Sequence, residues 1–225
     1  MTLSSLEIEA LQLSLQVALC AVGVTLPLGI GLAWVLARKP FPGRIILDGF
    51  VHLPLIVPPV VVGYLLLMVM GRRGFVGAWL WDTFQISIAF SLQGAAVAAG
   101  IMAFPLLVRP IRQGLEAVDP KLEQAACTLG APPLAVFVTV TLPLIAPGIL
   151  TGTILAFARC LGEFGATITF VSNIPGETQT LPLAIYTVLQ SPGGEAAAFR
   201  LVMISVVLAL GALIASEYLT RRTRK

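Results

Sequence analysis

The feature that most constrains the fold of this chain is a series of long segments without charged side chains. Four such segments contain no Asp, Glu, Lys or Arg: residues 11–37, 49–71, 83–108 and 124–158. A fifth apolar run follows Arg200 and ends at Glu217. About 20 consecutive apolar residues cross the hydrocarbon core of a bilayer as an α-helix. The sequence therefore predicts a helical protein that crosses a membrane several times.

The composition agrees, because 57% of the residues are hydrophobic and only 11% are charged, whereas a soluble domain carries about 25% charged residues. We predict an all-α polytopic membrane protein with about five spanning helices, at residues 11–37, 49–70, 85–108, 135–160 and 197–219. The first is no signal peptide, since it is too long and follows Glu7 and Glu9. Residues 181–189 predict a short helix at the outer surface. Whether residues 162–195 include a sixth or re-entrant element stays open.

The basic residues predict the orientation of these helices. Most of them fall on the same side of the membrane: Arg38, Lys39, Arg44, Arg109, Arg112, Lys121, Arg221, Arg222, Arg224 and Lys225. The remaining four are Arg72, Arg73, Arg159 and Arg200. Because cytoplasmic loops carry an excess of Lys and Arg, we expect the first group to be cytoplasmic. The N terminus then lies outside and the C terminus in the cytoplasm.

A polar segment between the third and fourth predicted spans has the signals of a short amphipathic helix. Asp119 is suited to cap the first turn and Pro120 to occupy the first helical position. Gly130 is suited to end the helix in the left-handed conformation. Four residues at helical spacing form an apolar face: Leu122, Ala125, Ala126 and Leu129. A helix this short is not stable alone in water, so we expect it to dock on another surface.

This segment resembles the signature of ABC-importer permeases, which reads Glu-Ala-Ala, three residues, Gly, nine residues, Ile-x-Leu-Pro. The corresponding residues are Gln124, Ala125, Ala126, Gly130, Leu142 and Pro143, with Glu123 just before them. Gln124 stands where Glu is usual, and Val140 replaces Ile. The resemblance implies a type I ABC-importer permease fold, in a single transmembrane domain of residues 1–225. It further implies that residues 109–143 contain a cytoplasmic coupling helix, which docks on an ATPase subunit and transmits its motion.

Two further features concern a transport path. Pro58 and Pro59 lie inside the second predicted span, and because proline removes a backbone hydrogen bond and kinks a helix, we predict a functional bend beside the path. Arg159 and Glu163 are four residues apart at the outer end of the fourth span. Their spacing predicts an ion pair on one helical face. The alternative is that Arg159 attracts an anion in an outer vestibule.

Longer segments resemble the molybdate permeases of bacterial ABC importers: residues 52–67, 71–77, 161–178 and 192–195. The resemblance covers nearly the whole chain. It implies a homodimer of permeases in the bacterial inner membrane, with two cytoplasmic ATP-binding subunits and a periplasmic oxyanion-binding protein. It also implies that molybdate moves from the periplasm into the cytoplasm by alternating access. A permease for tungstate, or for sulfate and thiosulfate, is the alternative.

The chain has none of the sequence motifs that mark ATP hydrolysis, zinc chemistry or a nucleophile elbow. Its single histidine and three widely spaced cysteines do not make a metal site. We therefore expect no enzyme and no bound cofactor or metal, with ATP and Mg held by a partner ATPase. The sequence has no basic face with interleaved aromatic residues, so we expect no nucleic-acid partner. Membrane lipid is the remaining expected contact. An ion-coupled secondary transporter is the alternative of a different class.

Overall fold

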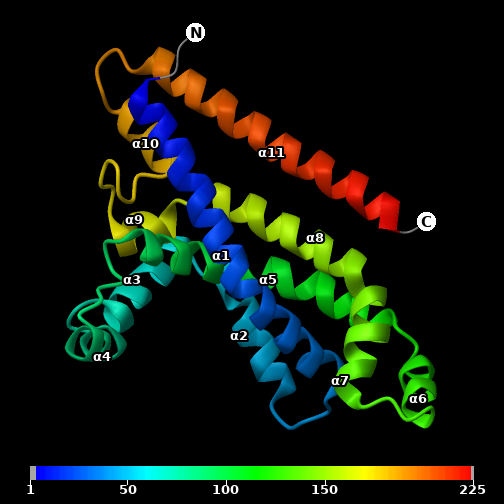
Figure 1. Cartoon of the computed structure of the whole chain (residues 1–225). Coiled ribbons are helices and arrows are strands. Elements are labelled where there is room, and N and C mark those ends of the chain that lie inside the picture. Colours follow the sequence, from blue (N-terminus) through cyan, green and yellow to red (C-terminus); the bar gives the residue numbers. More distant parts are fainter. Residues whose placement is uncertain (1–3, 224–225) are drawn as a thin grey trace.

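The computed structural model describes residues 4–223, which fold into helices joined by turns and short loops (Figure 1). In chain order these are α1 (Ser5–Arg38), α2 (Arg44–Ile56), α3 (Pro59–Met70), α4 (Phe75–Phe84), α5 (Leu92–Ala117), α6 (Pro120–Thr128), α7 (Pro133–Val136), the π-helix η1 (Phe137–Thr141), α8 (Leu142–Leu161), α9 (Gly165–Val171), α10 (Leu181–Leu189) and α11 (Glu195–Thr223). Two basic residues of the predicted cytoplasmic C terminus, Arg224 and Lys225, lie outside the described residues.

Four stretches in the described part of the chain are long and apolar enough to cross a membrane. They are Ser5–Arg38, Leu92–Ala117, Pro133–Leu161 and Glu195–Ala215. They correspond to the first, third, fourth and fifth predicted spans. The expected all-helical membrane fold is therefore confirmed, and the bent pair α2–α3 makes a fifth crossing if it is counted as one span.

The second predicted span, over residues 49–70, is present as a bent pair of helices, and the bend falls at the prolines Pro58 and Pro59 as predicted. The chain breaks into α2 and α3, and its direction bends by 115° between the two helices. Val57 has an extended backbone with ψ 138°, the conformation that a following proline favours. Pro58 is also extended, and Pro59 occupies the first position of α3, where the missing N–H costs nothing. The paired prolines thus end one helix and begin the next in a new direction.

The helix α5 forms the centre of the structure, between α1 and α8 (Figure 1). Its interior positions are small residues that are almost fully buried: Ala95, Ala98, Ala99 and Ala103. The helix α8 approaches through Gly148 and Gly152, where an added Cβ would lie 2.7 Å from the Pro110 carbonyl oxygen and 2.6 Å from the Leu107 carbonyl oxygen. Small residues allow such close contact between helices in membranes.

The segment of residues 162–195 folds into two short helices. The predicted helix at residues 181–189 is present as α10, and the Leu181 N–H at its start donates to Ser14 Oγ of α1 at 2.7 Å. The sequence leaves open a further element in this segment, and the structure places α9 there. It packs against α3 so closely that a Cβ added to Gly63 of α3 would lie 2.5 Å from the Ala166 carbonyl oxygen of α9. Both helices are too short to cross a membrane alone.

Candidate functional site

The helix α6 forms where the sequence predicts a capped amphipathic helix. The Asp119 side chain accepts a hydrogen bond from the Lys121 N–H at 2.9 Å, and Pro120 occupies the first turn. Gly130 has φ 89°, the left-handed conformation that glycine adopts without strain. No residue of α6 is buried, and Leu129 keeps 88% of its surface exposed. An apolar side of this helix is therefore left uncovered by the chain itself.

One carboxylate oxygen fixes α6 to the rest of the molecule. Glu123 Oε1 accepts hydrogen bonds from Arg38 Nη2 at 3.1 Å and from Thr141 Oγ1 at 2.7 Å. The Arg38 and Glu123 side chains are only 17% and 24% exposed, and Thr141 is buried. We call this arrangement the Glu123 clamp. It joins the end of α1, the helix α6 and the end of η1, although its three residues lie far apart in the sequence.

The other end of the sequence motif lies directly after the π-helix. Residues of η1 form the wider turn in which the Leu142 N–H donates to the Phe137 carbonyl oxygen. Leu142 and Pro143 then begin α8. Isolated π-helical turns are rare and occur often at functional sites. Because Thr141 holds Glu123, the clamp brings the two halves of the motif together in space.

A second network of charges links α2 to α5. Asp48 Oδ1 lies 2.8 Å from Arg112 Nη1, and Arg112 Nε lies 2.8 Å from Glu116 Oε1. Arg44 Nη2 lies 3.5 Å from the same Glu116 oxygen. Arg44 and Arg112 belong to the group of basic residues for which the sequence predicts a cytoplasmic position, but their acidic partners do not follow from the sequence. The fold supplies the partners, since Asp48 and Arg112 lie on different helices.

The predicted ion pair at the far end of α8 is present. Arg159 Nη1 lies 2.6 Å from Glu163 Oε2, and the other carboxylate oxygen accepts from the Ala166 N–H at 2.8 Å. Glu163 is only 2% exposed. The carboxylate therefore has two tasks: it neutralises Arg159 and it caps the first turn of α9. The sequence indicated the first of these and missed the second.

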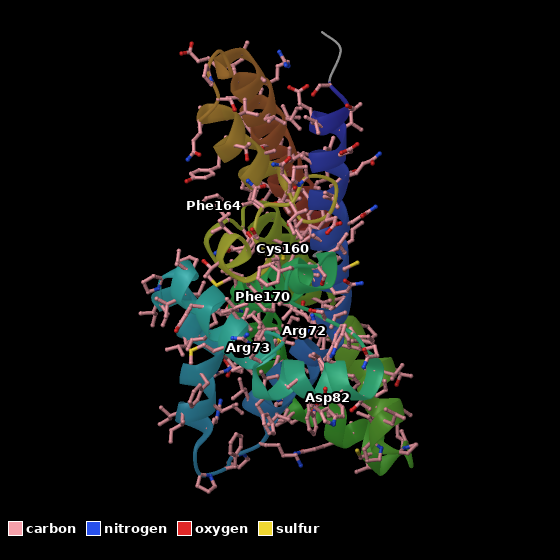
Figure 2. All side chains as sticks on the ribbon, turned by 90° about the vertical axis from the view of Figure 1, so that its left-hand side faces the viewer. Arg72, Arg73, Asp82, Cys160, Phe164 and Phe170 are labelled. Carbon is pink, nitrogen blue, oxygen red and sulfur yellow. The ribbon has the colours of Figure 1, made fainter. Side chains whose placement is uncertain are left out.

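The proline bend adjoins this ion pair. A Cβ on Gly165 would lie 2.7 Å from the Pro59 Cβ, so the start of α9 rests on the start of α3. Pro58 is exposed beside it. The Phe164 ring packs against Tyr186 with ring centres 5.3 Å apart, and Phe164 lies above Phe170 in Figure 2. The four residues predicted for a path or gate (Pro58, Pro59, Arg159 and Glu163) thus gather in one region, which is separate from the Glu123 clamp.

The chemistry of these two regions is that of hydrogen bonds, ion pairs and helix packing. Within residues 4–223 no group of three His, Cys, Asp or Glu side chains is placed to hold a metal ion. The cysteines are free, with Cys20 and Cys127 exposed and Cys160 buried. His52, the single histidine, contacts the Asp48 carbonyl oxygen through Nδ1 at 2.8 Å.

Comparison with known proteins fits this geometry. Residues 26–225 match the family described as binding-protein-dependent transport system inner membrane component. The chain is 60% identical to the molybdenum transport system permease protein ModB of Escherichia coli strain K12, over 100% of this chain and 98% of that protein. It is 54% identical to ModB of Haemophilus influenzae, over 98% of this chain and 96% of that protein.

Among solved structures, the fold is similar to a bacterial ABC transporter involved in the import of the acidic polysaccharide alginate. The TM-score is 0.78 at 18% sequence identity, and the match covers 99% of this chain and 81% of the other. At this identity the likeness concerns the fold alone. It places the helices described above in the arrangement of an ABC-importer permease.

The Glu123 clamp predicts a measurable coupling between side chains. Glu123→Ala leaves the Arg38 guanidinium and the Thr141 hydroxyl without this acceptor in a mostly buried place, which costs about 1–3 kcal/mol. We expect the purified Glu123→Ala protein to unfold at a lower temperature. Once the carboxylate is gone, Thr141→Val should cost little more. A double-mutant cycle over the two positions measures this, and strictly additive losses would show that the two groups are not coupled.

Proposed function

The chain belongs to the family of binding-protein-dependent transport system inner membrane components, and we propose that it is the permease subunit of an ATP-driven molybdate importer. The observation that carries the substrate is the 60% identity, over the full chain, to a molybdenum transport permease. Tungstate, and sulfate or thiosulfate, are the alternative substrates. An ion-coupled secondary transporter is not favoured, because the family depends on binding proteins.

The proposed assembly contains two copies of this chain, two cytoplasmic subunits that bind ATP and Mg, and a periplasmic oxyanion-binding protein. Residues 1–225 form one transmembrane domain that itself hydrolyses nothing. The exposed side of α6, with Leu122 at 49% and Leu129 at 88% exposure, supports a docking contact with an ATP-binding subunit. The family description supports the binding protein.

The Glu123 clamp gives a physical route for coupling. A displacement of α6 acts on α1 through Arg38 and on η1 through Thr141, because both donate to the same oxygen. The helix η1 continues into α8, whose far end carries Arg159, and Glu163 lies in the turn directly after it. Motion of the ATP-binding subunits would therefore reach the proline bend through one continuous helix. Alternating access then follows from the change in the angle between these elements.

We place the translocation path beside the proline bend, and we propose that Arg159 holds Glu163 in position rather than attracting the anion. Its positive charge is already neutralised by Glu163 at 2.6 Å, so an approaching dianion meets no net positive charge at this pair. Glu163→Gln frees the positive charge and keeps an oxygen acceptor for the Ala166 N–H. We expect this variant and Arg159→Gln to slow uptake alike. Faster uptake in Glu163→Gln would instead assign Arg159 to anion attraction.

We propose that α6 and the C terminus lie in the cytoplasm and the N terminus lies outside. In support, Arg38, Arg44 and Arg112 are drawn together near the α6 end of the molecule by their acidic partners, and basic residues favour the cytoplasmic side. Reporter fusions after Arg44 and Gly130 should signal cytoplasm, and a fusion after Arg73 should signal the periplasm. A cytoplasmic signal after Arg73 would contradict this topology.

The decisive experiment measures oxyanion uptake in a strain that lacks only this chain. Supplying the wild-type chain should restore molybdate uptake. Competition by unlabelled tungstate and by sulfate then ranks the alternative substrates. Restored sulfate uptake without molybdate uptake would overturn the proposed substrate but leave the permease role intact.

The same strain tests α6 as the coupling element. Ala126→Glu places a charge at a half-buried position of α6, and Gly130→Val forces a β-branched residue to φ 89°, at a cost of about 1–2 kcal/mol. Both variants should reach the membrane yet lose transport and ATPase association. Matched controls are Ala126→Ser and Gly130→Asn, because asparagine tolerates the left-handed region. Normal uptake by both Ala126→Glu and Gly130→Val would remove α6 from this role.

A further inference from the structure

The helix α4 lies at the membrane boundary opposite the coupling helix. The spanning helix α5 begins at Leu92, shortly after α4 ends at Phe84, and its other end at Ala117 leads directly into α6. A helix of 26 residues is about 39 Å long, which exceeds the hydrocarbon thickness of a bilayer. The two ends of α5 therefore lie at opposite boundaries. In Figure 1, α4 accordingly lies far from α6, at the end of α3.

The outer surface of α4 is aromatic. Phe75 is 90% exposed, Trp79 58% and Phe84 56%, and the Trp79 and Phe84 rings meet edge to face with centres 5.7 Å apart. Gly77 is the only buried residue of α4, and it packs closely on the carbonyl oxygens of Gly71 and Met70. This short helix is therefore held against the end of α3 and turns its aromatic residues outward.

Two arginines precede α4 and remain available for a ligand. The Arg72 Cζ lies 3.9 Å from the centre of the Trp81 ring, which fixes the direction of the guanidinium. Figure 2 shows Arg72 and Arg73 close together at this side of the molecule, with Asp82 below them. Within the described part of the chain neither arginine has a carboxylate partner. The arginines of α8 and α11, Arg159 and Arg200, each have one, at 2.6 Å and 2.8 Å.

We propose that α4 is an interfacial helix whose exposed aromatic residues lie in the lipid headgroup layer, and that Arg72 and Arg73, which precede it, bind the phosphate of an anionic phospholipid. Tryptophan and other amphipathic rings concentrate at the boundary between lipid and water. Guanidinium groups match phosphate oxygens in geometry and charge. The residues from Gly71 to Ser91 include only one acid, Asp82, so the local charge attracts anions.

A lipid occupant fits better than a protein because the exposed aromatic residues of α4 continue an apolar helical surface. The exposed large residues of α3 are Val60, Val61, Tyr64, Leu65, Met68 and Val69. They lead without a charged residue to Gly71, from which Arg72 and the α4 aromatics follow. This order, from apolar to basic and aromatic, is the one that a chain meets as it leaves the hydrocarbon for the headgroups.

The position of Trp79 tests the first half of the proposal. The full-length chain in lipid nanodiscs is compared with its Trp79→Phe variant, so that the difference in fluorescence reports Trp79 alone. Lipids brominated close to the headgroup should quench this signal more than lipids brominated near the chain end. Quenching by aqueous acrylamide but not by lipid would indicate a water-facing surface for a protein partner. Quenching by neither would indicate a second copy of the chain, and each of these two results overturns the proposal.

Lipid preference tests the arginines. Energy transfer from Trp79 to pyrene-labelled phosphatidylglycerol, relative to pyrene-labelled phosphatidylcholine, measures the local enrichment of anionic lipid. We expect the ratio to fall about fivefold for each arginine replaced by Gln, the effect of one basic residue at an anionic surface. Replacement of both arginines by Lys should keep most of the preference. The matched control is Arg109→Gln, which replaces an exposed arginine on a different helix, α5. Equal energy transfer to the two labelled lipids in the wild type would refute the assignment.

Discussion

The close contact of α5 with α8 is the interaction on which the rest of the structure depends. In a bilayer no hydrophobic effect drives one helix onto another, so association relies on dispersion contacts and shape. Gly148 and Gly152 let α8 approach the backbone of α5 so closely that a methyl group would not fit. Cys160 Sγ, at the far end of α8, also lies 3.5 Å from the Ala99 carbonyl oxygen. The two helices therefore form a rigid pair that carries the Glu123 clamp at one end and the proline bend at the other.

This rigid pair explains why two distant regions can act together. A helix transmits displacement along its axis, whereas a loop absorbs it. The clamp holds α8 through Thr141, and Glu163 attaches α9 to the other end by accepting from the Ala166 N–H. The start of α9 in turn rests on Pro59. A motion that begins at α6 thus has few flexible links to cross before it reaches the bend.

The membrane accounts for the placement of the irregular elements. Backbone groups that are not paired within a helix cost several kcal/mol in hydrocarbon unless protein or water satisfies them. The chain interrupts its helices at Pro58 and Pro59 and after Leu161, and it widens the helix Pro133–Leu161 by one π-helical turn at η1. Both breaks are covered, because α9 lies on the bend and Glu163 caps the turn into α9, and α6 lies beside η1. These covered breaks are the places where the angle between helices can change.

The sequence by itself determined the spans, the capped helix α6 and the short helix α10, because these depend on local properties: an apolar run, Asp119 at an N-cap and Gly130 at a left-handed turn. The ion pair of Arg159 with Glu163 was also predictable from its i, i+4 spacing, although α8 ends at Leu161 and Glu163 lies in the turn that follows. Only the tertiary structure decided the 115° angle of the bend, the formation of α9 and the partners of Glu123. Prolines show where a helix must break, but packing against distant helices sets the direction in which it continues.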